Sequence, residues 1–242
     1  MRVLVFSDVH ANVEALKAII KKADEFDAAW CLGDLVGYGP DPNECIEIVR
    51  ELPDLLCLIG NHDQAAIGAI PLSRFNRDAS SVIAWTRQQL TQSNFDFLRN
   101  LASRITVEQF TLTHGSPNQP IWEYILDLHT AERNFDAFET DYCLVGHSHL
   151  PLMFHMNSKE LIVSQWTFEW DKPTQLKPRM ILNPGSAGQP RDGDPRASFA
   201  ILDTIRDTWE MHRAEYDVSK VQARILEHGL PERQALRLLA GW

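Results

Sequence analysis

The chain has 242 residues, of which 44% are hydrophobic and 23% charged. This length suits one large domain or two small ones with a buried core, and the apolar fraction is too high for a disordered chain. With 33 acidic and 23 basic residues the formal net charge is −10, which argues against non-specific binding to nucleic acids or membrane surfaces, because these need clustered basic charge.

The N-terminal part alternates apolar runs with amphipathic segments. Strands are predicted over Val3–Phe6, Ala28–Leu32 and Leu55–Ile59. Asn12 has the position of an N-cap before the first helix. The segment Asp41-Pro42-Asn43-Glu44 places a cap, a first-turn proline and a capping-box glutamate at the start of the second. This β-α-β-α-β order predicts a parallel sheet covered by helices.

The middle of the chain is expected to be helical first and then mixed. Residues 64–101 are predicted to be largely helical. Ile105–Val107 and Phe110–Thr113 are predicted to form an antiparallel pair, and Thr130–Phe138 a helix. The strand Tyr142–Val145 follows and runs into Gly146-His147-Ser148-His149. If this end stays extended, His147 and His149 face the same side, because side chains two residues apart do so.

The chain turns β-rich beyond Pro151 and ends in helices. Five strands are predicted: Leu152–His155, Leu161–Ser164, Met180–Leu182, Ala197–Leu202 and Trp209–Arg213. Two helices are predicted to follow, Val218–Glu227 and Glu232–Leu239. The interval Gln165–Pro178, in which Trp166, Phe168 and Trp170 alternate, is expected to be a hairpin or a lid-like excursion.

We expect one domain over residues 1–242, with two sheets between helices, because no repeat, low-complexity linker or domain boundary is visible. The N-terminal apolar run is too short for a signal peptide, and no run approaches the ~20 residues of a membrane span. The four cysteines form no CxxC pair, and three lie in apolar runs, which favours buried free thiols and a reducing, cytoplasmic location.

Metal-type residues recur where successive predicted strands end. The motifs are Ser7-Asp8-Val9-His10, Gly33-Asp34, Gly60-Asn61-His62-Asp63, His114-Gly115 and Gly146-His147-Ser148-His149. The other four histidines, His129, His155, His212 and His228, are treated as ordinary surface or core residues. Singly, each motif also fits a turn cap, a βα turn or a helix start. Together they predict a metal site, because α/β folds gather ligands at the carboxyl ends of strands.

The ordered motifs D-x-H, G-D, G-N-H-D, H and G-H-x-H, from Asp8 to His149, resemble the calcineurin-like metallophosphoesterase family. The run Asn183–Arg191 (NPGSAGQPR) is similar to a small bacterial and archaeal branch of phosphodiesterase type. The resemblance implies an α/β fold, a four-layer α-β-β-α sandwich with two mixed β-sheets flanked by helices.

By motif position, the resemblance implies a centre of two divalent metal ions. Asp8, His10 and His149 would hold one ion, Asn61, His114 and His147 the other, and Asp34 would bridge them. Two ions about 3.5–4 Å apart clamp a phosphoryl group and generate hydroxide near neutral pH. The ligands admit Mn, Fe, Zn, Co or Ni. Such a centre has a net charge of about +1, the local attraction that an acidic protein needs for phosphate.

His62 is expected to be catalytic and not a ligand. The family uses this position to contact a phosphate oxygen and to stabilise or protonate the leaving group, a role suited to a histidine. A histidine that caps a helix is the alternative. Asp63 is a candidate for orienting its ring.

Substrate contacts are expected from Asn61, His62, Arg191 and Tyr38. Protein Ser/Thr phosphatases have Asp-Arg where this chain has Gly37-Tyr38, and Arg where it has Ile59. The acid that orients the catalytic histidine and two phosphate-binding arginines are therefore missing, which disfavours that activity. Arg191 is the candidate replacement, although a solvated loop arginine fits equally well.

The sequence favours a dinuclear-metal-dependent phosphoesterase. It would hydrolyse phosphodiester or phosphomonoester bonds of small molecules, nucleotides or dinucleoside polyphosphates, by attack of a metal-bound hydroxide. Tyr38, Trp122 and the Trp166 group are candidates for stacking a base or for core and lid packing. A catalytically silent binding or scaffold protein is the alternative, and a nuclease is disfavoured by the lack of a basic stripe. The oligomeric state stays open.

Overall fold

The first strand, β1 (Arg2–Phe6), sends alternate side chains into two different cores. Leu4 and Phe6 belong to a cluster of 25 buried residues that includes Leu16 of helix α1 (Val13–Ala23). Val3 and Val5 belong to a second cluster of 18 residues, shared with strands of the other sheet. Because strand side chains alternate, β1 lies in an inner layer between helices and a second sheet.

The computed structural model describes residues 1–242 and contains two six-stranded mixed sheets. The first has the order β3-β2-β1-β11-β12-β9. Its further strands are β2 (Ala28–Cys31), β3 (Leu56–Cys57), β9 (Pro173–Gln175), β11 (Ala197–Asp203) and β12 (Thr208–Ala214). The pairs β1–β2 and β2–β3 are parallel, as predicted, and the other pairs are antiparallel.

The second sheet has the order β4-β5-β6-β10-β7-β8. Its strands are β4 (Arg104–Val107), β5 (Phe110–Thr113), β6 (Tyr142–Leu144), β7 (Pro151–Asn157), β8 (Ile162–Trp166) and β10 (Met180–Pro184). The predicted antiparallel pair β4–β5 is confirmed, while β5–β6 and β6–β10 are parallel.

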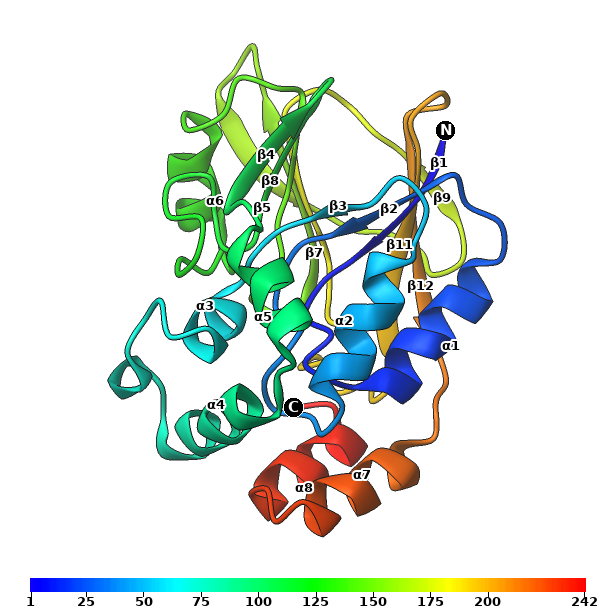
Figure 1. Ribbon diagram of the computed structural model, residues 1–242. Coiled ribbons are helices and arrows are strands. Elements are labelled where there is room, and N and C mark those ends of the chain that lie inside the picture. Colours follow the sequence, from blue (N-terminus) through cyan, green and yellow to red (C-terminus); the bar gives the residue numbers. More distant parts are fainter.

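Helices cover the outer faces of both sheets (Figure 1). Helix α1 and helix α2 (Pro42–Arg50) pack on the first sheet, and α6 (Leu128–Phe135) packs on the second. The expected α-β-β-α arrangement is therefore confirmed. The remaining helices are α3 (Asn61–Ala66), η1 (Leu72–Arg74), α4 (Arg77–Gln89), α5 (Gln92–Arg99), α7 (Val218–Glu227) and α8 (Glu232–Ala240). A separate cluster of six buried residues joins α4 to α7 and α8.

Helix α2 begins at the predicted place but without the predicted capping box. Pro42 is its first residue and Asp41 its N-cap, yet the Asp41 side chain makes no cap hydrogen bond. That carboxylate instead accepts a hydrogen bond of 2.8 Å from Arg224 of α7. Long-range pairing has replaced local capping, which a sequence pattern does not reveal.

The interval Gln165–Pro178 is not a hairpin, and that prediction is wrong. It leaves the edge strand β8 of the second sheet and becomes the edge strand β9 of the first. Trp166 and Phe168 pack against the core between the sheets. The segment therefore closes the open edge of the sandwich and does not form a lid.

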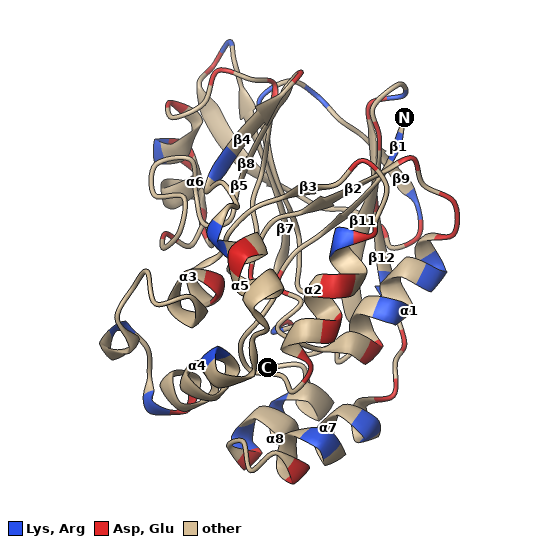
Figure 2. Ribbon diagram, viewed as in Figure 1, with Lys and Arg blue, Asp and Glu red and all other residues tan.

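The four cysteines are buried and free, as expected. No helix has the length and apolar character needed to cross a membrane. Charged residues of both signs are interspersed along the helices in the ribbon of Figure 2, and this view shows no continuous run of basic residues.

Candidate metal centre

The residues predicted as metal ligands come together because they follow strands whose carboxyl ends meet. Asp8 and His10 follow β1, Asp34 follows β2, and Asn61 begins α3 directly after β3. His114, His147 and His149 follow β5 and β6 of the other sheet. The parallel pairs align these ends within each sheet, and face-to-face packing brings the two edges together.

Left-handed backbone is concentrated among these residues. The φ angles are 54° for Asp8, 48° for His10, 55° for Asp34, 63° for His147 and 60° for His149. Such angles are uncommon for residues other than glycine and cost on the order of 1–3 kcal/mol each where the strain is fully felt. A cluster of them is typical of a functional site, where packing holds loops in strained forms.

The two histidines of the Gly146-His147-Ser148-His149 loop do not lie in an extended segment, so the condition for their facing the same side is not met. Strand β6 ends at Leu144, and both histidines have positive φ. They still reach one site, but they join different groups of side chains, one with Asp8 and His10 and one with Asp34 and His114.

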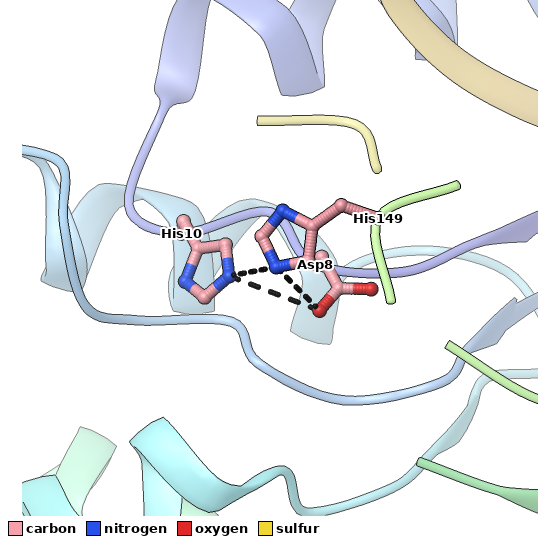
Figure 3. Close-up of side chains that lie close together, drawn as sticks. All are labelled: Asp8, His10 and His149. Atoms are coloured by element: carbon pink, nitrogen blue, oxygen red, sulfur yellow. Dashed lines mark hydrogen bonds and ion pairs between the residues drawn. The ribbon is translucent and has the colours of Figure 1, made fainter. Parts of the chain in front are cut away.

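The first group consists of Asp8, His10 and His149 (Figure 3). His10 Nε2 lies 3.1 Å from His149 Nε2, and Asp8 Oδ1 lies 3.3 Å from His149 Nε2 and 3.8 Å from His10 Nε2. Asp8 Oδ1 is buried and has no hydrogen-bond partner. Three donor atoms therefore converge on one point, as the ligands of a single cation do.

The second group consists of Asp34, His114 and His147, with Asn61 beside it. Asp34 Oδ2 lies 3.4 Å from His114 Nε2, and Asn61 Oδ1 lies 3.1 Å from that same nitrogen. His147 Nε2 is buried without a partner. Asp34 Oδ2 also lies 3.7 Å from His10 Nε2, so this one carboxylate oxygen faces both groups.

Backbone hydrogen bonds fix which atoms face the centre. The Nδ1 atoms of His10, His114 and His149 lie 3.2, 2.9 and 2.6 Å from main-chain carbonyl oxygens. Carbonyls only accept, so each Nδ1 must carry a proton, and in the neutral ring Nε2 has its lone pair toward the centre. Asp8 Oδ2 and Asp34 Oδ1 accept hydrogen bonds from main-chain N–H groups, which leaves their other oxygens free.

Burial and charge pairing favour the ionisation states that metal ligands need at most of these positions. Burial lowers the pKa of His10 and His149 well below the usual value and that of His147 to about 3, so these rings are neutral. Although burial opposes ionisation, His114 and His62 keep the pKa of Asp34 below its ordinary value. Against the effect of burial, Asp34 raises the pKa of His114 to about 10, so that ring must lose a proton to bind a metal.

The run Asn183–Arg191, noted for its sequence similarity, supports the ligand loops. Ser186 Oγ and the N–H of Gly188 donate hydrogen bonds of 2.8 and 2.9 Å to the carbonyl of Asp8. Asn183 Nδ2 donates one of 2.8 Å to the carbonyl of Gly146. The sequence identified the run but not these supporting roles, because its partners lie far away along the chain.

His62 is buried beside both groups but is not held by a carboxylate. Its Nδ1 has no hydrogen-bond partner, and burial lowers its pKa to about 4. Asp63 accepts hydrogen bonds from the N–H groups of Gly60 and Val36, at 2.9 and 3.0 Å, so the suggestion that Asp63 orients His62 is wrong. The N-cap of α3 is Gly60, so His62 is not a helix cap either.

The backbone of Gly37 leaves no room for the aspartate that protein Ser/Thr phosphatases have at this position. It has φ +94°, and a Cβ built on it would collide with Nδ1 of His62. Gly37 stands at the position where protein Ser/Thr phosphatases have an aspartate. In this chain the ring of His62 occupies the space that a side chain at position 37 would need. The His62 ring packs directly on the main chain of Gly37.

Arginines and aromatic rings form a rim around the centre. The Tyr38 ring lies 4.6 Å from the His10 ring and 4.4 Å from the His62 ring, and only 8% of Tyr38 is exposed. Arg191 and Arg237 each place their Cζ 5.9 Å from the Tyr38 ring centre. Arg191 thus lies beside the site, as expected. The contact of Tyr38 with a substrate stays a prediction, because only the small exposed part of the Tyr38 side chain could make it.

The opposite part of the rim is aromatic. The Phe75 ring lies 5.0 Å from the His62 ring and 5.5 Å from Trp122, whose face is covered by Arg74 at 4.3 Å. Tyr124 stacks on His147 at 3.9 Å. Sequence analysis singled out Trp122 but missed the others, and it missed Arg237 because nothing in the pattern of α8 connects it to the strand ends.

Comparisons with known proteins agree with this geometry. A family model described as the calcineurin-like phosphoesterase superfamily domain matches residues 1–207. The crystal structure of a metallophosphoesterase from Sphaerobacter thermophilus is 43% identical, covers 100% of both chains and has a TM-score of 0.91. An uncharacterised protein of Methanocaldococcus jannaschii is 36% identical over 249 residues, covering 99% of this chain and 98% of its own length.

A partial similarity extends to a symmetrical bis(5′-nucleosyl)-tetraphosphatase of Proteus mirabilis. It is 32% identical over 106 residues, which amount to 37% of this chain and 38% of that enzyme.

Proposed function

The chain belongs to the calcineurin-like phosphoesterase superfamily, and from this we propose that it is a hydrolase of phosphate esters that works with two divalent metal ions. The observation that carries the proposal is the convergence of histidine nitrogens and carboxylate oxygens in two groups, with Asp34 Oδ2 facing both. Buried polar atoms without partners, Asp8 Oδ1 and His147 Nε2, fit cation ligands and would otherwise be costly.

Each ion has its own set of side chains. Asp8, His10 and His149 would hold one, Asn61, His114 and His147 the other, and Asp34 both. Ions in such a centre act as Lewis acids on phosphoryl oxygens and lower the pKa of water. Oxygen and imidazole ligands suit Mn and also Fe, Co, Ni and Zn, and we propose manganese as the first ion to test.

His62 would act on the substrate and not on the metals. It lies against the ring of His10, with 4.9 Å between ring centres, and can contact a phosphoryl oxygen or the leaving group from there. Burial favours its neutral form, so a bound anionic phosphate would be needed to keep the ring protonated for transfer to the leaving group. Gly37 and the absence of an orienting carboxylate continue to disfavour protein Ser/Thr phosphatase activity.

We propose a small phosphate ester, a nucleotide or dinucleoside polyphosphate, as substrate. The partial similarity to a symmetrical tetraphosphatase supports this class. So does the aromatic part of the rim, where Phe75 and Trp122 are partly exposed and could contact a base. The net charge of −10 argues against nucleic acid polymers, whose binding depends on extended basic surface.

Metal analysis and a substrate panel test the proposal. The purified chain should bind two equivalents of a divalent ion and hydrolyse members of a panel of p-nitrophenyl phosphate, bis-p-nitrophenyl phosphate, a nucleoside diphosphate and diadenosine tetraphosphate. Mn²⁺, Zn²⁺, Co²⁺, Ni²⁺ and Fe²⁺ are compared. Metal binding without turnover of any member of the panel would favour a catalytically silent binding protein, and no metal binding would refute the centre itself.

A further inference from the structure

Arg191 and Arg237 lie on one rim although 46 positions separate them, since 237 − 191 is 46. Arg191 follows the run that supports Asp8, and Arg237 lies in the last turn of α8. Both guanidinium carbons are 5.9 Å from the centre of the same Tyr38 ring. That ring packs on His10 and His62, so Tyr38 links both arginines to the candidate metal centre.

Two direct links join α8 to the loop that carries Arg191. Gln189 Nε2 donates a hydrogen bond of 3.2 Å to Gln234 Oε1 of α8. The N–H of Gly193 donates one of 2.9 Å to the carbonyl of Gly241, just after α8. The position of Arg237 is therefore set by the fold.

Neither arginine is paired with an aspartate or a glutamate. Arg191 Nη2 donates to the amide oxygen of Gln189 at 3.3 Å, and its Nε is buried without a partner. Arg237 Nε donates to the backbone oxygen of Trp242, the last residue of the chain, at 2.6 Å. By contrast, Arg213 is paired with Asp192 and Arg224 with Asp41.

The two positive charges affect each other. Burial lowers the pKa of Arg237, and the charge of Arg191 lowers it further. Like charges placed together in a partly buried site destabilise each other, and an anion bound between them relieves this.

We propose that Arg191 and Arg237 form a binding site for a second phosphate group, so that the preferred substrate carries at least two phosphoryl groups in a chain. One phosphoryl group would lie at the metal centre and the next one on the rim between the guanidinium groups. Guanidinium forks match phosphate oxygens in geometry and charge. This inference rests on the proposed function and narrows its substrate class to nucleoside or dinucleoside polyphosphates.

A binding measurement tests the rim site without hydrolysis. Methylene diphosphonate and methylphosphonate, which share a non-hydrolysable P–C bond, are titrated by calorimetry into the chain loaded with Mn²⁺. The wild type should prefer the diphosphonate, and Arg237→Gln should weaken its binding about tenfold or more, the loss expected for a hydrogen bond to a charged group. Binding of methylphosphonate should change less than twofold. Equal losses for both ligands, or no loss for either, would overturn the proposal.

Matched variants separate the charge from the fold. Arg237→Gln keeps a donor for the backbone oxygen of Trp242, and Arg237→Lys keeps the charge and should recover part of the affinity. Arg206→Gln removes an arginine that is 81% exposed on the turn between β11 and β12 and should leave diphosphonate binding unchanged. If Arg191 and Arg237 hold one phosphate group, the losses in the double variant Arg191→Gln/Arg237→Gln should not add, and simple additivity would contradict a shared site.

The outcomes for the rim site and for catalysis are separable. Pyrophosphate binding to the metal-free chain, prepared by dialysis against a chelator, should also weaken about tenfold in Arg237→Gln. If this holds while no ester is hydrolysed, the rim site stands and the proposed function fails. If esters are hydrolysed while Arg237→Gln changes neither ligand's binding nor the KM for ADP and diadenosine tetraphosphate, the function stands and the rim site is refuted.

Discussion

Replacing Asp34 by asparagine should damage the centre more than any other single ligand change, because its Oδ2 faces both groups of side chains. That oxygen lies 3.7 Å from His10 Nε2 and 3.4 Å from His114 Nε2. Its Oδ1 accepts a hydrogen bond of 2.9 Å from the N–H of His62. An asparagine must keep its oxygen at that position, so its NH₂ group, which cannot bind a cation, would face the centre.

The expected loss follows from this geometry. Removing an outer partner of a metal ligand costs about 10–100-fold in metal affinity, and Asp34 is itself in ligand position for both ions, so we expect a loss of at least about 100-fold, or about 2.8 kcal/mol. The pKa of His114 should also fall in the metal-free chain, from about 10 to below its ordinary 6.5, because Asp34 is what raises it against burial.

Metal content, calorimetric metal titration and an NMR titration of His114 measure these effects, together with turnover. Asp63→Asn is the matched control, since Asp63 is equally buried but uses both oxygens for main-chain N–H groups. It should lower the Tm while the chain still binds its full complement of metal. Full metal occupancy and normal turnover in Asp34→Asn would refute the shared-ligand assignment.

Three further predictions concern the proposed catalytic residue, His62, and the protons of the site. His62→Ala should retain the metals and lower kcat by about 10²–10⁴-fold for poor leaving groups, with a smaller loss for nitrophenolate esters; an equal loss for both would contradict proton donation. Gly37→Ala should also lower kcat, because the added methyl group meets the His62 ring. Gly229→Ala is the control, since Gly229 also has positive φ but nothing lies within 4 Å of the added methyl group, and this variant should lose only stability. Similar activity in the two variants would exclude the collision with His62. Metal binding should release a proton from His114 below pH 10, so that affinity rises with pH, and binding heats that do not vary with the ionisation enthalpy of the buffer would contradict this.

Much of the chain's architecture followed from local patterns. The apolar run of β1 and the helical spacing of apolar residues in α1 predicted elements that the structure contains within a few residues, and α7 and α8 also lie where helices were predicted. The ligand motifs were recognisable because each follows directly after a strand, and strand ends of parallel pairs share an edge. The predicted capping box at Asp41 does not form, because the Asp41 carboxylate accepts a hydrogen bond from Arg224, which is far away in sequence.

The sequence by itself determined that seven ligand-type residues and His62 lie at strand ends, since strand periodicity and short βα loops are local properties. Only the tertiary structure decided the direction of each lone pair, because the Nδ1 protons of His10, His114 and His149 are held by carbonyls from other loops. It also decided that the Asp63 carboxylate binds main-chain N–H groups and not His62, and that the His62 ring packs on Gly37, where no acidic side chain fits. The meeting of Arg191 with Arg237 has the same origin, because contacts between residues far apart in sequence depend on how the last helix packs, and no local pattern encodes that.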